Sequence, residues 1–209
     1  EGGQRWFHLY PEEPAMAPEH PLHWTSPDQT WNYQCADCHS TGLEKGYDLE
    51  RNAYATTWAE IDVACEACHG PARAHVAQAN AVASGNADAW TRDKGLAVVL
   101  GETAEVRWLV DPETGLPRRS PPRTSHAETE LCARCHSRRG QIHAEEIPGA
   151  PLGDRYQLAL LDPGLYHADG QILDEVFVHG SFLQSRMYAA GVTCSDCHEP
   201  HSLSLKRDG

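Results

Sequence analysis

The chain has 209 residues, 40% of them apolar and only three of them phenylalanine, which is little side-chain material for a conventional core. The formal net charge of −13 argues against charge-driven binding to nucleic acid or to an anionic membrane. No run of eighteen apolar residues is present, which excludes a transmembrane helix, and the first residues lack the basic start and apolar stretch of a signal peptide. We therefore expect either that a signal was removed or that the chain is a processed piece of a longer protein.

The first part of the chain is predicted to form an extended arm followed by three helices. Residues 1–30 hold many prolines and few helix signals, which is typical of an arm rather than a packed layer. A capping box with proline at the first helical position predicts a helix over 31–39. A second box predicts a helix over 57–69 that stops at Gly70, and an alanine-rich stretch that begins with proline predicts another over 71–83.

The second part mixes hairpins and helices. Two extended pieces around an Asp-Pro-Glu-Thr-Gly turn predict a hairpin within 95–118. A further box predicts a helix over 125–136. An Ala-Asp-Gly turn predicts a second hairpin within 164–179, and a last box predicts a helix over 181–190 that breaks at Gly191.

All eight cysteines fall into four copies of Cys-x-x-Cys-His, so none is left over for another purpose. This motif attaches a c-type haem, because the two thiols form thioether bonds to the vinyl groups and the histidine binds the iron. We therefore predict four covalently bound haem c groups. The cysteines and proximal histidines are Cys35, Cys38 and His39; Cys65, Cys68 and His69; Cys132, Cys135 and His136; and Cys194, Cys197 and His198.

Other kinds of cysteine-based site fit these four motifs less well than haem does. A zinc ribbon also pairs Cys-x-x-Cys units, but it does not require histidine directly after each second cysteine. A thioredoxin-like redox pair would occur once, within a βαβ context that the sequence lacks. Zinc and iron–sulfur sites remain as the alternatives to haem.

Four haems also account for the small supply of core residues, because the apolar macrocycles themselves would form the core. We expect a mainly α fold with much irregular structure and one or two short β-hairpins, organised by haem as a single tetrahaem domain over residues 1–209. Haem is attached outside the cytoplasm, so we expect a periplasmic or extracellular protein.

Nine further histidines and only two methionines make a second histidine the expected distal ligand of each iron. His75 lies on the predicted helix after Gly70, and His126 lies on the helix face opposite Cys135, from which it would reach a neighbouring haem. His201 is turned away from its own motif by the preceding proline. The candidates in order are His75, His126, His201, His167, His23 and His8, whereas His20, His143 and His179 are expected to be ordinary hydrogen-bonded or solvated side chains.

The segments 31–41, 66–71, 132–138 and 194–201 resemble the large multihaem cytochromes c that are often fused to tetratricopeptide repeats, within the group related to hydroxylamine oxidoreductase. In that group, the histidines that match His75 and His201 often ligate neighbouring haems. Such relatives continue at both ends with further haem sites. A weaker likeness is to small multihaem cytochromes that polymerise into extracellular filaments.

The predicted function is electron transfer, with a redox partner protein or an extracellular acceptor, and with copies of the chain itself if it forms a head-to-tail filament. An acidic chain suits a basic partner or a mineral surface, but the charge is explained more simply as ordinary solubility. The alternative is a multihaem reductase of nitrogen or sulfur oxyanions, which requires one open haem with acid–base groups beside it. A haem sensor or storage protein has no support beyond the haems.

The sequence has two clusters of basic residues, which either pair with haem propionates or lie on solvated loops. They are Arg118, Arg119 and Arg123, and Arg138 and Arg139.

Overall fold

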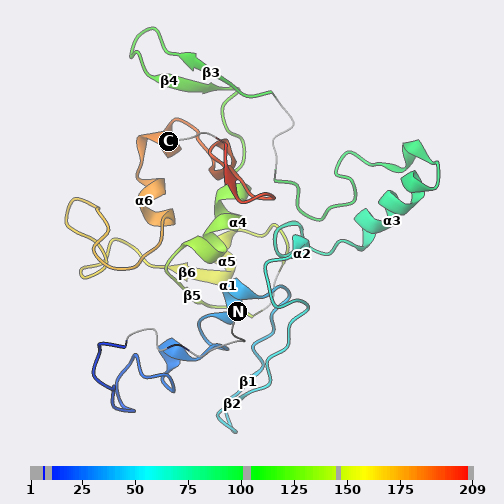
Figure 1. Cartoon of the computed structure of the whole chain (residues 1–209). Coiled ribbons are helices and arrows are strands. Elements are labelled where there is room, and N and C mark those ends of the chain that lie inside the picture. The colour runs from blue at the N-terminus through cyan, green and yellow to red at the C-terminus, as the bar shows by residue number, and fades with distance from the viewer. Residues whose placement is uncertain (1–6, 8–10, 101–104, 145–146, 207–209) are drawn as a thin grey trace.

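The computed structural model describes residue 7 and residues 11–100, 105–144 and 147–206. Within these ranges, short helices alternate with long irregular connections (Figure 1). The α-helices are α1 (Ala36–His39), α2 (Cys65–His69), α3 (Arg73–Ala83), α4 (Ala127–His136), α5 (Leu152–Arg155), α6 (His179–Leu183) and α7 (Arg186–Ala189), and the 3-10 helices are η1 (Pro27–Gln29), η2 (Ala87–Ala89) and η3 (Cys194–Asp196).

The described strands form four two-stranded antiparallel sheets, more than the one or two hairpins that the sequence predicts. Three of the sheets join strands that are close in sequence, whereas one pairs segments on either side of α5. The pairs are β1 (Tyr47–Asp48) with β2 (Ala53–Tyr54), β3 (Arg107–Val110) with β4 (Pro117–Ser120), β5 (Arg139–Gln141) with β6 (Tyr156–Leu158), and β7 (His198–Glu199) with β8 (Ser204–Leu205).

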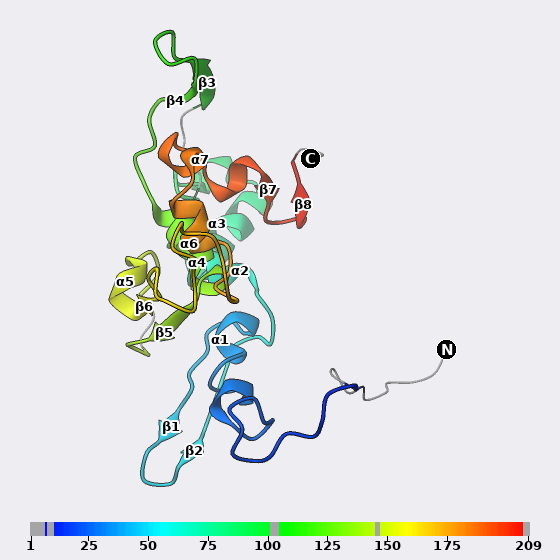
Figure 2. The same cartoon turned by 90° about the vertical axis from the view of Figure 1, so that its left-hand side faces the viewer.

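Helix α4 lies at the centre of the structure, and α1, α5, α6 and η3 all contact it (Figure 1). The principal buried apolar cluster consists of Ala133 on α4 together with Leu152 and Tyr156, with Leu158 packed against it. The hairpins β1–β2 and β3–β4 extend away from this centre in opposite directions (Figure 2). The core therefore lies where α4, α5 and β6 meet.

The predicted helix over 71–83 is confirmed as α3, and the predicted hairpin within 95–118 is confirmed as β3–β4. Helix α4 covers most of the predicted 125–136 segment, and the Ser125 hydroxyl accepts a hydrogen bond from the Ala127 backbone N–H at its start. These elements form where propensity and turn chemistry agree over a short stretch of chain.

The two helices predicted before α3 are much shorter than expected. Residues 31–35 form turns, so only α1 is helical in the first segment. In the second segment, Thr57 exchanges backbone hydrogen bonds with Glu44, and Glu60 forms a bridge with Thr41. The capping-box prediction at Thr57 is therefore wrong, because pairing with a distant extended segment satisfies the same backbone groups that a helix would use.

The predicted helix over 181–190 is divided into α6 and α7. Ser185 has an extended backbone, and its hydroxyl accepts a hydrogen bond from the Tyr188 N–H, so it starts a new helix in the middle of the segment. Gly191 ends α7 with a φ of 99°, as the sequence predicts. The second predicted hairpin is reduced to a turn with one bridge between Tyr166 and Ile172.

The described part of the arm, residues 11–26, contains turns but no helix or strand. Figure 2 shows that this segment leads away from α4 and the hairpins. Trp24 is 78% exposed there, and Leu22 is also exposed. The predicted arm over residues 1–30 is thus a series of turns that ends in η1 within its described part, and it stays a prediction.

The polypeptide leaves an unusually large area accessible. A folded monomer of 23.1 kDa exposes about 9,700 Å², whereas this chain exposes 15,789 Å². Many large apolar side chains are exposed and few are buried among the described residues. The polypeptide therefore does not cover its own apolar surface. None of the described helices combines the length and apolar composition needed to cross a bilayer.

Candidate haem-binding site

The four Cys-x-x-Cys-His motifs lie at or beside helix α4. Motif 1 (residues 35–39) includes α1, motif 2 (65–69) is α2, motif 3 (132–136) ends α4, and motif 4 (194–198) begins with η3. In motifs 1, 2 and 3 the helix ends at the histidine itself. Motif 4 is a 3-10 turn followed by strand β7, so its histidine leaves the helical turn.

Motifs 1 and 3 are in direct contact. The Cys38 sulfur lies 4.0 Å from the backbone oxygens of Arg134 and Cys135. The hydrogen bond from the Cys135 thiol is the main reason that the pKa of the Cys38 thiol is lowered to about 7. The same hydrogen bond, together with burial, raises the pKa of the Cys135 thiol. Attachment points that are 97 positions apart in sequence therefore lie side by side.

Motifs 2 and 4 also contact α4. The Arg134 guanidinium donates a hydrogen bond of 3.1 Å to the Ala67 oxygen, inside motif 2. Glu128 accepts hydrogen bonds from the Ser195 backbone N–H (2.6 Å) and hydroxyl (2.8 Å), inside motif 4. A hydrogen bond with the Cys194 thiol and burial raise the pKa of the Cys132 thiol, so motifs 3 and 4 meet at their first cysteines. Helix α4 thus joins all four motifs.

The observed residues fit covalently attached haem. All eight motif cysteines are free thiols, and each is at least partly accessible, as attachment to a vinyl group requires. The large exposed apolar surface is what the polypeptide would present if apolar macrocycles normally covered it. Among the described residues, no group of three or more His, Cys, Asp and Glu side chains converges as a metal site.

Two histidines are oriented by backbone carbonyl groups. The Nδ1 atom of His69 lies 3.0 Å from the Val98 oxygen, and that of His75 lies 2.8 Å from the Lys94 oxygen. Because a carbonyl can only accept, the imidazole proton is on Nδ1 and the Nε2 lone pair is available to a metal. This is the arrangement that supports metal-bound histidines in proteins.

Gly70 permits the contact at His69. It ends α2 with a φ of 69°, and a Cβ at this position would lie 2.8 Å from the side chain of Pro148 and 3.0 Å from that of Ala97. The absence of a side chain lets the chain around Val98 approach motif 2 closely enough to hold His69. The sequence predicts this glycine only as a helix terminator.

His201, which follows motif 4, also lies beside motif 2. Its ring is 6.2 Å from that of His69 between centroids, with 10° between the ring planes. The His201 Nδ1 atom lies 3.1 Å from a Glu199 carboxylate oxygen, so its Nε2 is also available. The structure thus places these two histidines close together.

The remaining distal candidates lie in varied surroundings. His126 is the residue just before α4, not within the helix as predicted, and its Nδ1 atom is 2.7 Å from the Tyr188 hydroxyl of α7. His23 contacts the Thr25 hydroxyl within the arm, and His167 is exposed at the turn that joins Tyr166 to Ile172. His8 lies outside the described residues.

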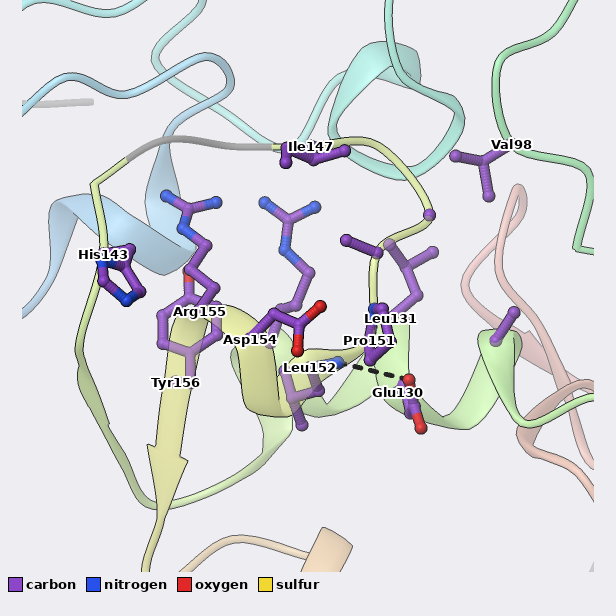
Figure 3. Close-up of a pocket in the computed structure, with 14 residues that line it drawn as sticks. Val98, Glu130, Leu131, His143, Ile147, Pro151, Leu152, Asp154, Arg155 and Tyr156 are labelled. Carbon is purple, nitrogen blue, oxygen red and sulfur yellow. Dashed lines mark hydrogen bonds between the residues drawn. The ribbon is translucent and has the colours of Figure 1, made fainter.

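Two histidines that the sequence treats as ordinary lie close to α4. His179 is buried at the start of α6, and burial lowers its pKa. His143 lines a cavity of about 250 Å³ beside α4 and α5. Figure 3 shows Arg155 and Tyr156 at this cavity, with the Leu152 N–H bonded to Glu130. No local sequence signal distinguishes these two histidines, since their positions depend on packing between distant segments.

Arg139 is part of a buried charged cluster, not of a solvated loop. Its guanidinium lies 2.8 Å from Asp37 of motif 1, and their side chains are 9% and 4% exposed. The Tyr156 hydroxyl donates to the same carboxylate at 3.1 Å. Burial and the Asp37 charge raise the pKa of Tyr156 to about 12. Arg138, in contrast, forms an exposed ion pair with Asp174.

Comparison with known proteins gives one family match. The family model described as "Cytochrome c554 and c-prime" matches residues 10–70, the segment that holds motifs 1 and 2. A search of curated proteins and a search of solved structures found no match. The family match supports a c-type cytochrome that carries haem c and takes part in haem-based electron transfer.

Proposed function

We propose that this chain binds four haem c groups, one at each motif, and transfers electrons among them and to a redox partner. The observation that carries this proposal is the contact of all four motifs with one helix, α4. Each bound haem supplies an iron that alternates between the ferric and ferrous states. Because the four attachment points are adjacent on one small scaffold, the bound haems would lie close together.

The chain's own residues supply attachment, orientation and electrostatics. The eight thiols fix the macrocycles covalently, and the motif histidines provide the proximal nitrogens. Carbonyl groups, such as that of Val98 at His69, hold the imidazole rings in the tautomer that a metal requires. The α4 helix then fixes the relative positions of the attachment points.

We further propose that His201 is the distal ligand at motif 2. One iron held between the two rings would require them to lie close together with a ring nitrogen of each free to bind it, at metal–nitrogen distances of about 2 Å. The rings of His69 and His201 lie 6.2 Å apart between centroids, and both keep Nε2 available. His75 and His126 remain the next candidates, each with one ring nitrogen held by a neighbour.

Mass spectrometry and optical spectroscopy of the matured protein test the proposal. The intact mass should exceed the polypeptide's 23.1 kDa by four haem masses, and acid–acetone should extract no haem. Ferric spectra should show four low-spin haems, and the reduced protein should not bind CO rapidly. A shortfall in haem would contradict the count. A stoichiometric high-spin haem would favour the reductase alternative.

The expected partner is a basic redox protein or an external acceptor such as a mineral surface. The polypeptide's charge of −13 favours complementary positive surfaces and disfavours nucleic acid. Haem attachment requires a location outside the cytoplasm, so we propose the periplasm or the extracellular space. Salt dependence of the rate of electron transfer to a basic partner would test this charge-driven association.

A filament of stacked subunits is a second candidate, and the exposed arm favours it. Residues 11–26 lead away from the body of the chain and carry His23 with the exposed Trp24 (Figure 2). Such an arm can reach the next subunit head to tail, and repeated contacts of this kind propagate as a helix. Electron microscopy of native material should show filaments that deletion of residues 1–24 abolishes. Discrete monomers at high concentration, with four low-spin haems after the deletion, would rule out the filament.

A further inference from the structure

The charged groups around motif 1 are predominantly positive. Arg139 and Arg155 lie 2.8 Å and 3.7 Å from Asp37, and all three side chains are at most 11% exposed. The Arg139 guanidinium also donates to the Cys38 sulfur at 3.5 Å. Lys45 is partly buried nearby, where its ammonium donates to the Tyr33 oxygen at 2.9 Å and interacts electrostatically with Asp37 and both arginines. Three cations thus surround one carboxylate.

The arrangement of these cations is fixed by packing. The Arg139 guanidinium stacks on the Tyr156 ring at 4.0 Å, and that of Arg155 lies 5.1 Å from the same ring. Arg139 also donates from Nε to the Arg134 oxygen. Low exposure and multiple contacts keep the charges near Cys38 and limit their screening by solvent.

The charged groups that contact motif 4 itself are carboxylates. Two arginines lie beside the segment before it, since Arg123 donates to the Val192 oxygen at 3.2 Å and Arg119 packs against Gly191. Glu128 accepts both hydrogen bonds from Ser195, and Asp196 accepts a hydrogen bond of 2.7 Å from the Thr193 N–H. Both carboxylates interact electrostatically with Cys194. Glu199 lies just beyond the motif, where it contacts His201 and interacts electrostatically with the exposed Lys206. The Arg134 guanidinium donates to the Ala67 oxygen of motif 2 and interacts electrostatically with Tyr156.

We infer that these charges build a redox gradient into the chain, with the highest haem potential at motif 1 and a low potential at motif 4. The inference rests on the proposed attachment of haem. A ferrous haem carries one negative charge more than a ferric haem, so nearby guanidinium and ammonium groups favour reduction and nearby carboxylates oppose it. Electrons held by the chain would therefore reside mainly at the motif 1 end, beside the arm.

Potentiometric titration of the holoprotein and its charge variants tests the gradient. Arg139→Gln should lower the highest midpoint potential, with about a tenfold smaller equilibrium constant for reduction, or about 59 mV for one electron. Lys45→Gln should lower the same potential, and this partly exposed side chain is easier to replace without loss of the fold. Glu128→Gln should raise the lowest potential. Arg139→Lys, which keeps the charge, should leave the highest potential near its original value.

Matched controls separate local charge from general effects. Arg138→Gln removes an exposed charge next to Arg139, and Glu113→Gln removes an exposed charge on the β3–β4 connection. Both should leave the four potentials nearly unchanged. The gradient is wrong if Lys45→Gln and Arg139→Gln leave the highest potential unchanged in protein that holds four haems by mass. A chain with fewer haems would instead contradict the proposed function.

Discussion

The imidazole rings of His69 and His201 lie nearly parallel, 6.2 Å apart, although 132 positions separate them in sequence. His69 ends motif 2, and His201 follows motif 4. Each ring has Nδ1 held by an acceptor, Val98 in one case and Glu199 in the other. The pair therefore brings a residue of the second motif next to a residue that follows the fourth.

Replacement of His201 by alanine should convert one of the four haems to high spin. The thioether bonds do not involve this residue, so the intact mass should still include four haems. The reduced variant should bind about one CO per chain, because one axial position is open. His20→Ala is the matched control, since His20 is exposed and its Nδ1 accepts a hydrogen bond from the Leu22 N–H. An unchanged spectrum in the His201 variant would contradict its role as a ligand.

Replacement of His126 by alanine should also open one axial position, at a haem other than that of motif 3. His126 precedes α4 and contacts Tyr188 on α7, so its ring is directed away from the motif at the other end of its helix. Tyr188→Phe should keep the ligand but remove the hydrogen bond at Nδ1, which weakens the imidazole as a donor. If all four haems stay low-spin in His126→Ala, His126 is not an axial ligand and only forms a hydrogen bond.

Local signals predict much of the secondary structure, and long-range contacts account for the differences. Helix α3 and the β3–β4 hairpin form where the sequence predicts them, because propensity and turn residues act over a few positions. The helix predicted from Thr57 does not form, because its backbone pairs with Glu44. Nothing near Thr57 in the sequence indicates that partner.

The chemistry of the candidate site can be predicted from sequence more fully than its arrangement. The eight cysteines and four proximal histidines follow from a short motif with a defined function. The ion pair of Asp37 with Arg139 joins residues about a hundred positions apart, and the sequence leaves Arg139 equally suited to a solvated loop. The same holds for His201 and His69, since only the folded chain shows which motif His201 approaches.

Replacement of Asp37 by asparagine should lower the free energy of unfolding by about 3 kcal/mol, because it leaves two buried guanidinium groups without their carboxylate. Urea unfolding, followed by far-UV circular dichroism, measures the change. Asp174→Asn is the control, because its ion pair with Arg138 is about half exposed. That variant should cost less than about 1 kcal/mol. Equal effects of the two substitutions would show that the buried cluster does not stabilise the fold.

His179 should make the stability depend on pH in a defined direction. It is buried at the start of α6, and burial lowers its pKa below the ordinary value of 6.5, although the Glu130 charge acts in the opposite sense. The unfolded chain therefore binds a proton at this residue at a higher pH than the folded chain does. The free energy of unfolding should fall as the pH drops below about 6.5 and should stop falling, for this residue, below its folded-state pKa.

The contribution of His179 can be isolated by comparing pH profiles of stability. His179→Gln removes the titration while keeping a polar side chain of similar size, so the variant's curve should be flatter between pH 7 and pH 5 than that of the original chain. His20→Gln makes the same substitution at an exposed position and serves as the control for the exchange itself. The difference between the two curves is the informative quantity, because carboxylates and other histidines titrate in both proteins and cancel in the comparison. Parallel curves for the original chain and His179→Gln would show that protonation of His179 does not change the free energy of unfolding.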